Sequence, residues 1–440
     1  MKFTLAKIFK VNPSDSIHMR SMGGALWSLV ATIFIQASAF ITAIIFANVL
    51  GDENFGKLNM VRSAILVFVA LAGSGLGMAA TKYTAEYRTS NPLRAGSLLG
   101  LLYLIATVVG LIVFICCLIF EKSLAEFTVG SADLALELAI GAGGLISLAL
   151  SSVQLGAIAG LEGFKRIVYL SAFESVLNLI FATFGALIWG VPGVLGGLTL
   201  VLVIMTPIKH YVLTKELNKF GIFITYQGVW RTGVAWKFIL PATLVSVTAQ
   251  PVEWILKLMV AKQFNGYEEV GIFAAASSLA LIVQILPSQL ATSGRSILPN
   301  LYASKDFAGI RRLVAINTLY SGLVGAFLAL ILAFLSNSLL GLYGPSFLKG
   351  VGVLYLLLLS YSMVVVSMTF TELLTACGYM WLQYIHRIIW SVITVFSGLY
   401  FFEPTAMGLA SAYASGNFVF VVAQAITVIF ILNGMKKINV

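Results

Sequence analysis

The residues of this chain that could carry chemistry are a few ionisable side chains inside long apolar runs. Glu253 and Lys257 are four residues apart, so both lie on one face of a helix, where they can pair. Gln250 and Pro251 precede them, and local unwinding beside polar side chains is a common way to build a site at membrane depth. This segment is therefore the richest candidate site, with a purely structural ion pair as the alternative.

Other ionisable residues inside apolar runs are Arg62, Glu174 and Glu372, and Arg295 follows another run. A charge at the centre of a bilayer is costly and usually faces a cavity or a partner. Each residue also has a structural interpretation: Arg62 could snorkel to the interface, Glu174 could bond a neighbouring helix, and Glu372 could lie at the membrane edge. Arg295 could be ordinary cytoplasmic charge, or it could receive an anionic head group.

The sequence shows no pattern typical of an enzyme, a metal site or a disulfide framework. The run Gly73–Gly77 lies inside an apolar segment with no preceding strand, which favours a kink or close helix packing over a phosphate loop. We therefore expect a protein that is not an enzyme and has no metal or other cofactor. The histidines and cysteines are scattered, without metal-ligand or CxxC spacing: His18, His210, His386, Cys116, Cys117 and Cys377.

The composition of the chain indicates that membrane-spanning helices carry these residues. The chain has 440 residues, of which 60% are hydrophobic and 10% are charged, and its mean hydropathy is +0.99. Soluble globular proteins are about 45–50% apolar and about 25% charged, so a water-soluble fold is excluded. The net charge of +10 favours basic cytoplasmic loops beside anionic membrane lipid rather than nucleic acid. We predict an all-α polytopic membrane protein.

The apolar runs predict about 12 transmembrane helices, because a span needs about 20 apolar residues. A tight turn at Gly190–Gly193 separates two runs that together are too long for one crossing. The predicted spans cover about 25–49, 60–80, 95–120, 134–159, 167–189, 193–213, 238–260, 270–290, 313–340, 350–374, 384–402 and 406–432.

The distribution of positive charge predicts the orientation, because Lys and Arg are retained on the cytoplasmic side. With the N-terminus inside, the predicted cytoplasmic segments hold most of the 27 Lys and Arg residues, Lys209 and Arg387 among them. Both termini are then cytoplasmic. The longest cytoplasmic segment, 214–237, mixes aromatic and basic residues and is expected to be an amphipathic surface helix. It would connect a six-helix lobe at 1–213 to a second six-helix lobe at 238–440.

A faint internal match suggests that the two lobes are copies of each other. Gly51–Gly56 follows the first predicted span and Gly266–Gly271 follows the seventh, an offset of 215 residues (266 minus 51). Each segment has a glycine, then residues that include an acid, then an apolar residue and a glycine that opens the next span. Because an even number of spans separates the copies, they would be related by an axis along the membrane normal.

Three segments in and around the first two predicted spans, 25–29, 47–56 and 75–83, carry a resemblance to a known family, and 269–273 and 298–299 are matching features of the second half. Through these residues the chain resembles the polysaccharide transporter family, the Wzx-type flippases of lipid-linked oligosaccharides in the MOP superfamily. That superfamily also holds the lipid II flippase and the MATE drug exporters. The resemblance covers most of the chain and is silent on the particular sugar.

The resemblance implies two six-helix lobes that form a V around a central cavity. It also implies that an undecaprenyl-diphosphate-linked oligosaccharide, the repeat unit of O-antigen, capsule or exopolysaccharide, is moved from the cytoplasmic to the periplasmic leaflet of a prokaryotic inner membrane by alternating access. Polysaccharide polymerase and chain-length proteins would be its partners. The cavity residues expected to meet diphosphate or acidic sugar are Arg62, Lys257, Arg295 and Gln250.

Two acids, Glu253 and Glu174, are the candidates for coupling transport to H⁺ or Na⁺. Relatives often carry an acid in the seventh span where this chain has Lys257, so a coupling role of that acid does not carry over to this position. The alternative function is a cation-coupled multidrug exporter of the MATE type, whose cavity should be acidic and aromatic. A membrane glycosyltransferase or polymerase would need a large outer loop or an acidic catalytic motif, which the sequence lacks.

Overall fold

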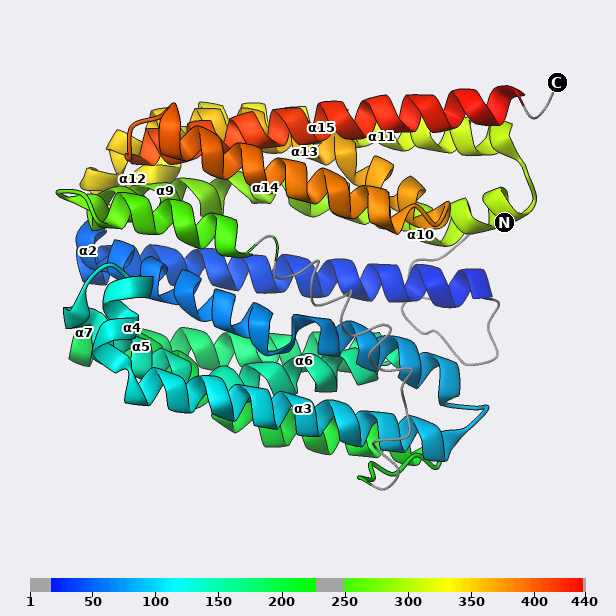
Figure 1. The fold of residues 1–440 in the computed structure, drawn as a ribbon, viewed down its shortest axis with the longest axis horizontal. Coiled ribbons are helices and arrows are strands. Elements are labelled where there is room, and N and C mark those ends of the chain that lie inside the picture. Colours follow the sequence, from blue (N-terminus) through cyan, green and yellow to red (C-terminus); the bar gives the residue numbers. More distant parts are fainter. Residues whose placement is uncertain (1–16, 227–247, 249, 438–440) are drawn as a thin grey trace. The chain divides into compact units, whose positions relative to one another are not determined.

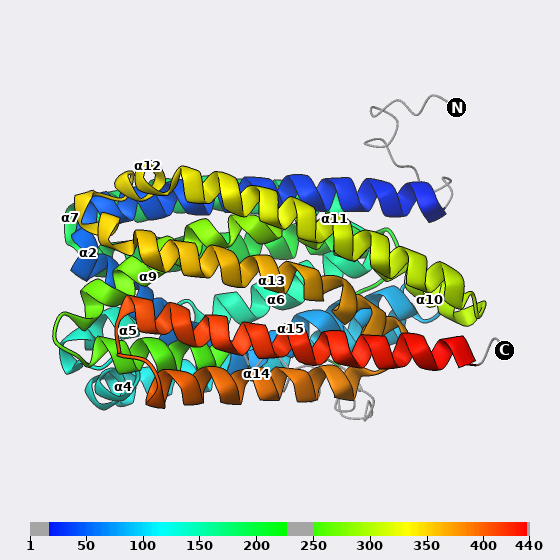
Figure 2. The same ribbon diagram turned by 90° about the horizontal axis from the view of Figure 1, so that it is seen from above.

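The computed structural model describes residues 17–226, 248 and 250–437. Within these ranges, the side chains at 17–31, 71–74, 292–296, 303 and 435–437 lie outside the description. The described residues form helices and short connections and contain no strand, so the all-α prediction is confirmed. Figures 1 and 2 show the ribbon from two directions. The chain divides into two units, Met1–Leu50 with Lys57–Trp254, and Gly51–Gly56 with Ile255–Val440.

Among the described residues, 7 helices are long and apolar enough to cross a membrane, or 8 when the bent pair α9–α10 counts as one span. Two of these helices, α2 and α7, contain a glycine with positive φ. Length alone therefore does not give the number of crossings, and the figure of about 12 stays a prediction. A multi-pass membrane protein is what these helices support.

Unit 1 is built from long apolar helices whose interior is lined by small and branched residues. At its centre α3, α6 and α7 pack together through buried side chains such as Leu98, Val153 and Met205. Its elements are α2 Ile17–Tyr87 (apart from residues 51–56), α3 Pro92–Ile119, α4 Glu121–Thr128, η1 Ala132–Leu134, α5 Ala135–Ala142, α6 Leu145–Gly160 and α7 Phe164–Asn218.

The helix α7 folds back on itself at Gly190, which has φ 63° and ψ −132°. This left-handed backbone favours glycine. The two halves then approach closely, since a Cβ on Gly185 or on Gly193 would overlap the backbone of the other residue. The tight turn expected at this point is confirmed, and it places residues 164–189 beside 191–218.

Small residues also allow α2 and α6 to touch. The backbone of Gly77 meets Gly156, and the Thr81 hydroxyl donates a hydrogen bond of 2.9 Å to the Gly156 carbonyl. A Cβ on Gly77 would lie 2.9 Å from the backbone oxygen of Ser152. The glycine-rich run at 73–77 lies inside a helix, and Gly77 serves close helix packing, as expected.

The start of the predicted connector differs from the prediction. Residues 214–218 belong to α7, and residues 222–226 have no regular secondary structure. The segment 222–226 runs along α3, where the Thr225 amide donates a hydrogen bond of 3.3 Å to the Gly96 carbonyl. Gly96 and Gly100 leave room for its backbone, because a Cβ on either glycine would overlap it. The rest of the connector, 227–237, lies outside the described residues.

Unit 2 is a bundle in which α13 contacts α10, α11 and α15, and α14 packs on α15. The pair α9–α10 is bent by 41°, and residues 250–261 are helical before it. The other elements of the unit are α9 Gly266–Ala280, α10 Ile282–Ala303, α11 Phe307–Phe334, α12 Ser336–Gly341, η3 Pro345–Gly350, α13 Val351–Ala376, α14 Met380–Tyr400 and α15 Ala406–Lys437.

The two matched glycine turns contact each other within unit 2. A Cβ on Gly56 would overlap the backbone oxygen of Tyr267, and a Cβ on Gly271 would overlap that of Asp52. The contact is reciprocal, because Gly271 and Tyr267 follow Gly56 and Asp52 by the same offset of 215 residues. Such a self-complementary contact is typical of elements related by a two-fold axis.

Candidate functional site

A buried ion pair lies inside unit 1. The Lys209 ammonium forms an ion pair with Glu174 Oε2 at 2.8 Å and donates a hydrogen bond to Ser151 Oγ at 2.5 Å. Lys209 is only 1% exposed, and the Glu174 side chain is 19% exposed. The pair forms because α7 folds back at Gly190, which brings its second half against its first half. A charge in such surroundings needs a partner, and here the two residues supply it for each other.

Other polar side chains extend this cluster across α3, α6 and α7. Gln154, one turn after Ser151, donates a hydrogen bond of 3.2 Å to the Thr206 carbonyl. Tyr103 and His210 share a hydrogen bond of 3.1 Å. The Gln154 Oε1 atom is buried and has no hydrogen-bond partner among the described residues. The helices of unit 1 therefore carry a row of polar groups through an otherwise apolar core.

Lys209, which the sequence counts with the cytoplasmic charges, is part of a helix and is buried in unit 1. The helix α7 continues to Asn218, past the predicted end of this span at 213. The side of the membrane on which this part of α7 lies stays a prediction. Glu174, a candidate for ion coupling, pairs with Lys209 on the neighbouring half of α7. This contact agrees with the structural interpretation of Glu174. Whether Glu174 also couples transport to an ion stays a prediction.

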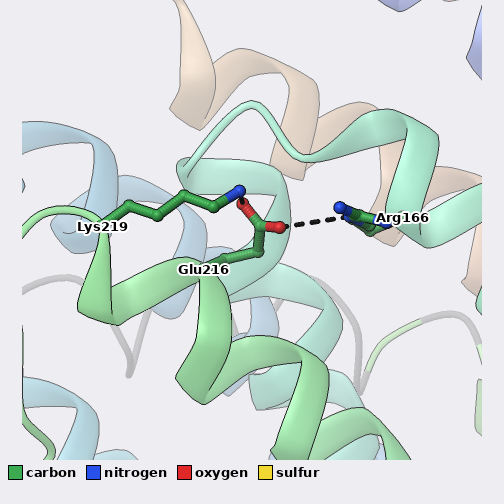
Figure 3. A network of polar contacts seen from close by, with 3 residues as sticks. All are labelled: Arg166, Glu216 and Lys219. Carbon is green, nitrogen blue, oxygen red and sulfur yellow. Dashed lines mark hydrogen bonds and ion pairs between the residues drawn. The ribbon is translucent and has the colours of Figure 1, made fainter.

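A second group of charges lies at the end of the same helix. Figure 3 shows Glu216 between Lys219, at 2.5 Å, and Arg166, at 3.2 Å. The Glu216 side chain is 11% exposed, whereas those of Lys219 and Arg166 are 53% and 49% exposed. Both bases reach solvent, so each pair contributes about 1 kcal/mol at most. This group joins the two ends of α7 and has the character of a structural ion network.

Unit 2 has a partly open cavity of about 430 Å³. Pockets for small molecules are typically about 300–1,000 Å³ and combine apolar walls with a few placed polar groups. Helices α10, α13, α14 and α15 supply the walls here. The lining residues are Gln284, Ser288, Ala291, Tyr361, Val364, Ser367, Met368, Thr371, Glu372, Arg387, Trp390, Tyr413, Asn417 and Phe420.

Arg387 is held in this cavity by two aromatic rings. Its guanidinium carbon lies 5.3 Å from the ring centroid of Trp390 and 5.0 Å from that of Phe420. The Trp390 ring is fixed in turn, because its indole N–H donates a hydrogen bond of 2.7 Å to Asn417 Oδ1. The Asn417 amide donates to Ser360 Oγ at 2.8 Å. These contacts hold a cation in one orientation at the cavity wall.

Arg387, which the sequence also counts with the cytoplasmic charges, lies within a helix. The helix α14 begins at Met380, before the predicted span 384–402, and Arg387 lies about two turns inside it. Gln383 stabilises this first part, since its amide donates to the Thr371 carbonyl and to Thr375 Oγ1, both at 2.8 Å. An apolar-run boundary cannot detect such an extension.

The expected site around Gln250 is only partly visible. Residues 250–261 form one helix that includes Pro251, so the expected unwinding is not present there. Lys257 is buried, and its ammonium lies 6.0 Å from the centroid of the Phe273 ring, while Gln250 and Glu253 are half-buried. None of these three is among the described lining residues of the unit 2 cavity.

The remaining candidates are separate from both polar groups. Arg62 lies on α2 with an exposed side chain and makes no ion pair with a described residue. Arg295 is on α10, and its side chain lies outside the description. Glu372 is buried and lines the cavity of unit 2. The described residues contain no group of three or more His, Cys, Asp or Glu side chains that could hold a metal ion.

The fold is that of a membrane transporter of the MOP superfamily. A multidrug resistance MATE family transporter of that superfamily, in its inward-facing conformation, has a TM-score of 0.78 at 14% identity, over 94% of this chain and 96% of that one. A MOP superfamily transporter from Pyrococcus furiosus has a TM-score of 0.72 at 16% identity, over 99% and 100%. At these identities the likeness establishes the fold alone.

The sequence comparison then gives the family. Residues 21–301, more than half of the chain, match the family described as polysaccharide biosynthesis protein. The EPS I polysaccharide export inner membrane protein EpsE of Ralstonia nicotianae is 25% identical over 179 residues, which is 38% of this chain and 40% of that protein. The match thus spans less than half the length of that relative. The chain belongs to the polysaccharide biosynthesis protein family and has the fold of MOP superfamily transporters, so the expected family is confirmed.

Proposed function

We propose that this membrane transporter is a flippase. It moves an undecaprenyl-diphosphate-linked oligosaccharide, a repeat unit of O-antigen, capsule or exopolysaccharide, from the cytoplasmic to the outer leaflet by alternating access. The observation that carries the proposal is the family match over residues 21–301 in a chain with the fold of MOP transporters. A family of polysaccharide biosynthesis combined with a transporter fold favours a protein that moves polysaccharide units across the membrane over one that makes them.

The polar interior of both units supports a hydrophilic cargo. A drug exporter for organic cations favours an acidic, aromatic cavity, whereas the cavity of unit 2 is lined by both Arg387 and Glu372 and by hydroxyl and amide groups. Sugar hydroxyls need such partners, because a polar group left unpaired in a dry interior is costly. Four more polar residues remain proposed substrate-binding residues, because a hydrophilic cargo needs polar partners: Arg62, Lys257, Arg295 and Gln250.

We infer that ion coupling at Glu174 uses H⁺ rather than Na⁺. The carboxylate already has a resident cation, since Lys209 lies 2.8 Å away. A sodium ion would have to displace that ammonium, whereas a proton on Glu174 would break the pair and free Lys209. Glu253 remains the second coupling candidate.

The setting of the protein completes the proposal. We place it in the inner membrane of a prokaryote with both termini in the cytoplasm, where the basic segments meet anionic lipid. It would hand its cargo to polysaccharide polymerase and chain-length proteins.

The test is a deletion strain of the native host. Membrane lipids are extracted, and undecaprenyl-linked oligosaccharide is quantified together with glycan on the cell surface. Accumulated lipid-linked repeat unit with loss of surface glycan supports the proposal, and the mass of the repeat unit identifies the cargo. Unchanged glycan with new sensitivity to cationic drugs contradicts it and favours the exporter alternative.

A further inference from the structure

We propose that the cavity of unit 2 is a binding site for a saccharide that carries an oxyanion, and that Arg387 binds this oxyanion. The inference rests on the proposed function, because it takes the cargo to be a saccharide. It adds a site inside the helix bundle of unit 2 and the chemical group that this site selects.

The first step is the state of the Arg387 side chain. It is half-buried, lines the cavity and forms no ion pair with a described acid. The rings of Trp390 and Phe420 are 5.3 Å and 5.0 Å from its guanidinium carbon. Aromatic rings contact the face of a guanidinium, so its N–H groups at the edge stay available as donors. A cation that lines a cavity among the helices of a membrane protein usually marks a ligand or a pathway.

The second step is the rigidity of the site. Trp390 is 6% exposed and is tied to Asn417 through its indole N–H. Asn417 in turn is tied to Ser360 on α13. These hydrogen bonds connect α13, α14 and α15, so the orientation of Arg387 is set before any ligand arrives. A preorganised guanidinium loses little entropy on binding a carboxylate or a phosphate, and both groups accept two parallel hydrogen bonds from it.

The third step is the rest of the cavity wall. Gln284 and Ser288 on α10 and Thr371 on α13 place amide and hydroxyl groups around the same space. A volume of about 430 Å³ accommodates a small number of sugar rings rather than a whole oligosaccharide. The site would therefore hold one charged part of the cargo, either a sugar carboxylate or a phosphate of the lipid linkage.

The experiment uses the full-length protein purified in detergent. Binding of D-glucuronate, D-glucose and inorganic phosphate is measured at constant ionic strength by the shift in unfolding temperature and by tryptophan fluorescence. The variants are Arg387→Gln and Arg387→Lys. The matched control is Arg94→Gln, because Arg94 also stacks on a ring, Tyr87 at 4.7 Å, but lies in unit 1.

The wild type and Arg94→Gln should bind glucuronate or phosphate and should not bind glucose. Arg387→Gln should weaken that binding by about tenfold to hundredfold, the usual worth of hydrogen bonds to a charged group. Arg387→Lys should lie between the two, since it keeps the charge without the planar fork. Binding of glucuronate alone assigns the site to an acidic sugar, and binding of phosphate alone assigns it to the lipid linkage.

Equal binding of the anions by wild type and Arg387→Gln, or no anion binding by the folded wild type, would overturn the proposal. The unfolding temperature without ligand shows whether each variant is folded, and Arg387→Lys serves if Arg387→Gln is not. The two proposals fail separately. A deletion strain that accumulates lipid-linked oligosaccharide while Arg387→Gln binds normally removes only this site. A strain without accumulation, with anion binding that depends on Arg387, removes only the flippase.

Discussion

Replacing Lys209 by methionine should destabilise the protein strongly, because it leaves the half-buried Glu174 carboxylate without its cation. Lys209 is 1% exposed, and its ammonium is 2.8 Å from Glu174 and 2.5 Å from Ser151. Removing one member of a buried ion pair typically costs about 3–5 kcal/mol. At roughly 2 °C per kcal/mol for a folded body of this size, the unfolding temperature should fall by roughly 6–10 °C.

The double variant Lys209→Met with Glu174→Gln should recover most of this loss, because no uncompensated charge remains. The assay is thermal unfolding of the full-length protein in detergent, followed by circular dichroism. Lys349 and Glu268 supply the control pair, since they lie 2.7 Å apart but their side chains are 68% and 23% exposed. Removing that exposed pair should change the unfolding temperature little or not at all, because solvent screens it.

The reasoning is refuted if the double variant is as unstable as the sum of its two single variants. Additive losses would mean that Lys209 and Glu174 do not interact. A loss for Lys209→Met no larger than that for Lys349→Met would contradict the burial argument in the same experiment.

Three further predictions concern packing. Gly271→Ala puts a Cβ into a backbone oxygen and should lower the unfolding temperature by several degrees, whereas Gly434→Ala, with nothing within 4 Å, should not lower it. Gly100→Ala should displace the segment 222–226 from α3, because the added Cβ would overlap its backbone. Limited proteolysis would detect this displacement as faster cleavage within residues 222–226. Trp390→Phe leaves the buried Asn417 oxygen without its donor and should cost about 1–3 kcal/mol in thermal unfolding.

Much of the fold could be predicted because the signals are local. The length of the apolar runs gives helices that can span a membrane, and glycines at special positions give turns and close contacts. Gly190 turns α7 back on itself, and Gly77 lets two helices touch. The matched pattern at Gly51–Gly56 and Gly266–Gly271 even identifies two segments that contact each other.

The polar interior could not be predicted in the same way, because it depends on where helices end and which faces meet. Lys209 and Arg387 lie near the ends of the predicted spans 193–213 and 384–402, so charge counting assigns both to the cytoplasmic side. The helices extend beyond those spans, and they bury Lys209 against Glu174 and hold Arg387 at a cavity wall. A lone acid such as Glu174 within a span does signal that a cation must be near. The segment 222–226 has the composition of an amphipathic helix, yet it is not helical, and Gly96 and Gly100 leave the space in which its backbone lies.

The most direct test of the proposed function is translocation by the purified protein. Lipid-linked oligosaccharide isolated from the deletion strain is reconstituted into vesicles with or without the protein, and a membrane-impermeant oxidant of sugars is added. If the protein is a flippase, oxidation should reach nearly all of the oligosaccharide in vesicles that contain it and only the outward-facing share in vesicles that lack it. Equal oxidation in both preparations, with the protein shown to be folded, would contradict the account.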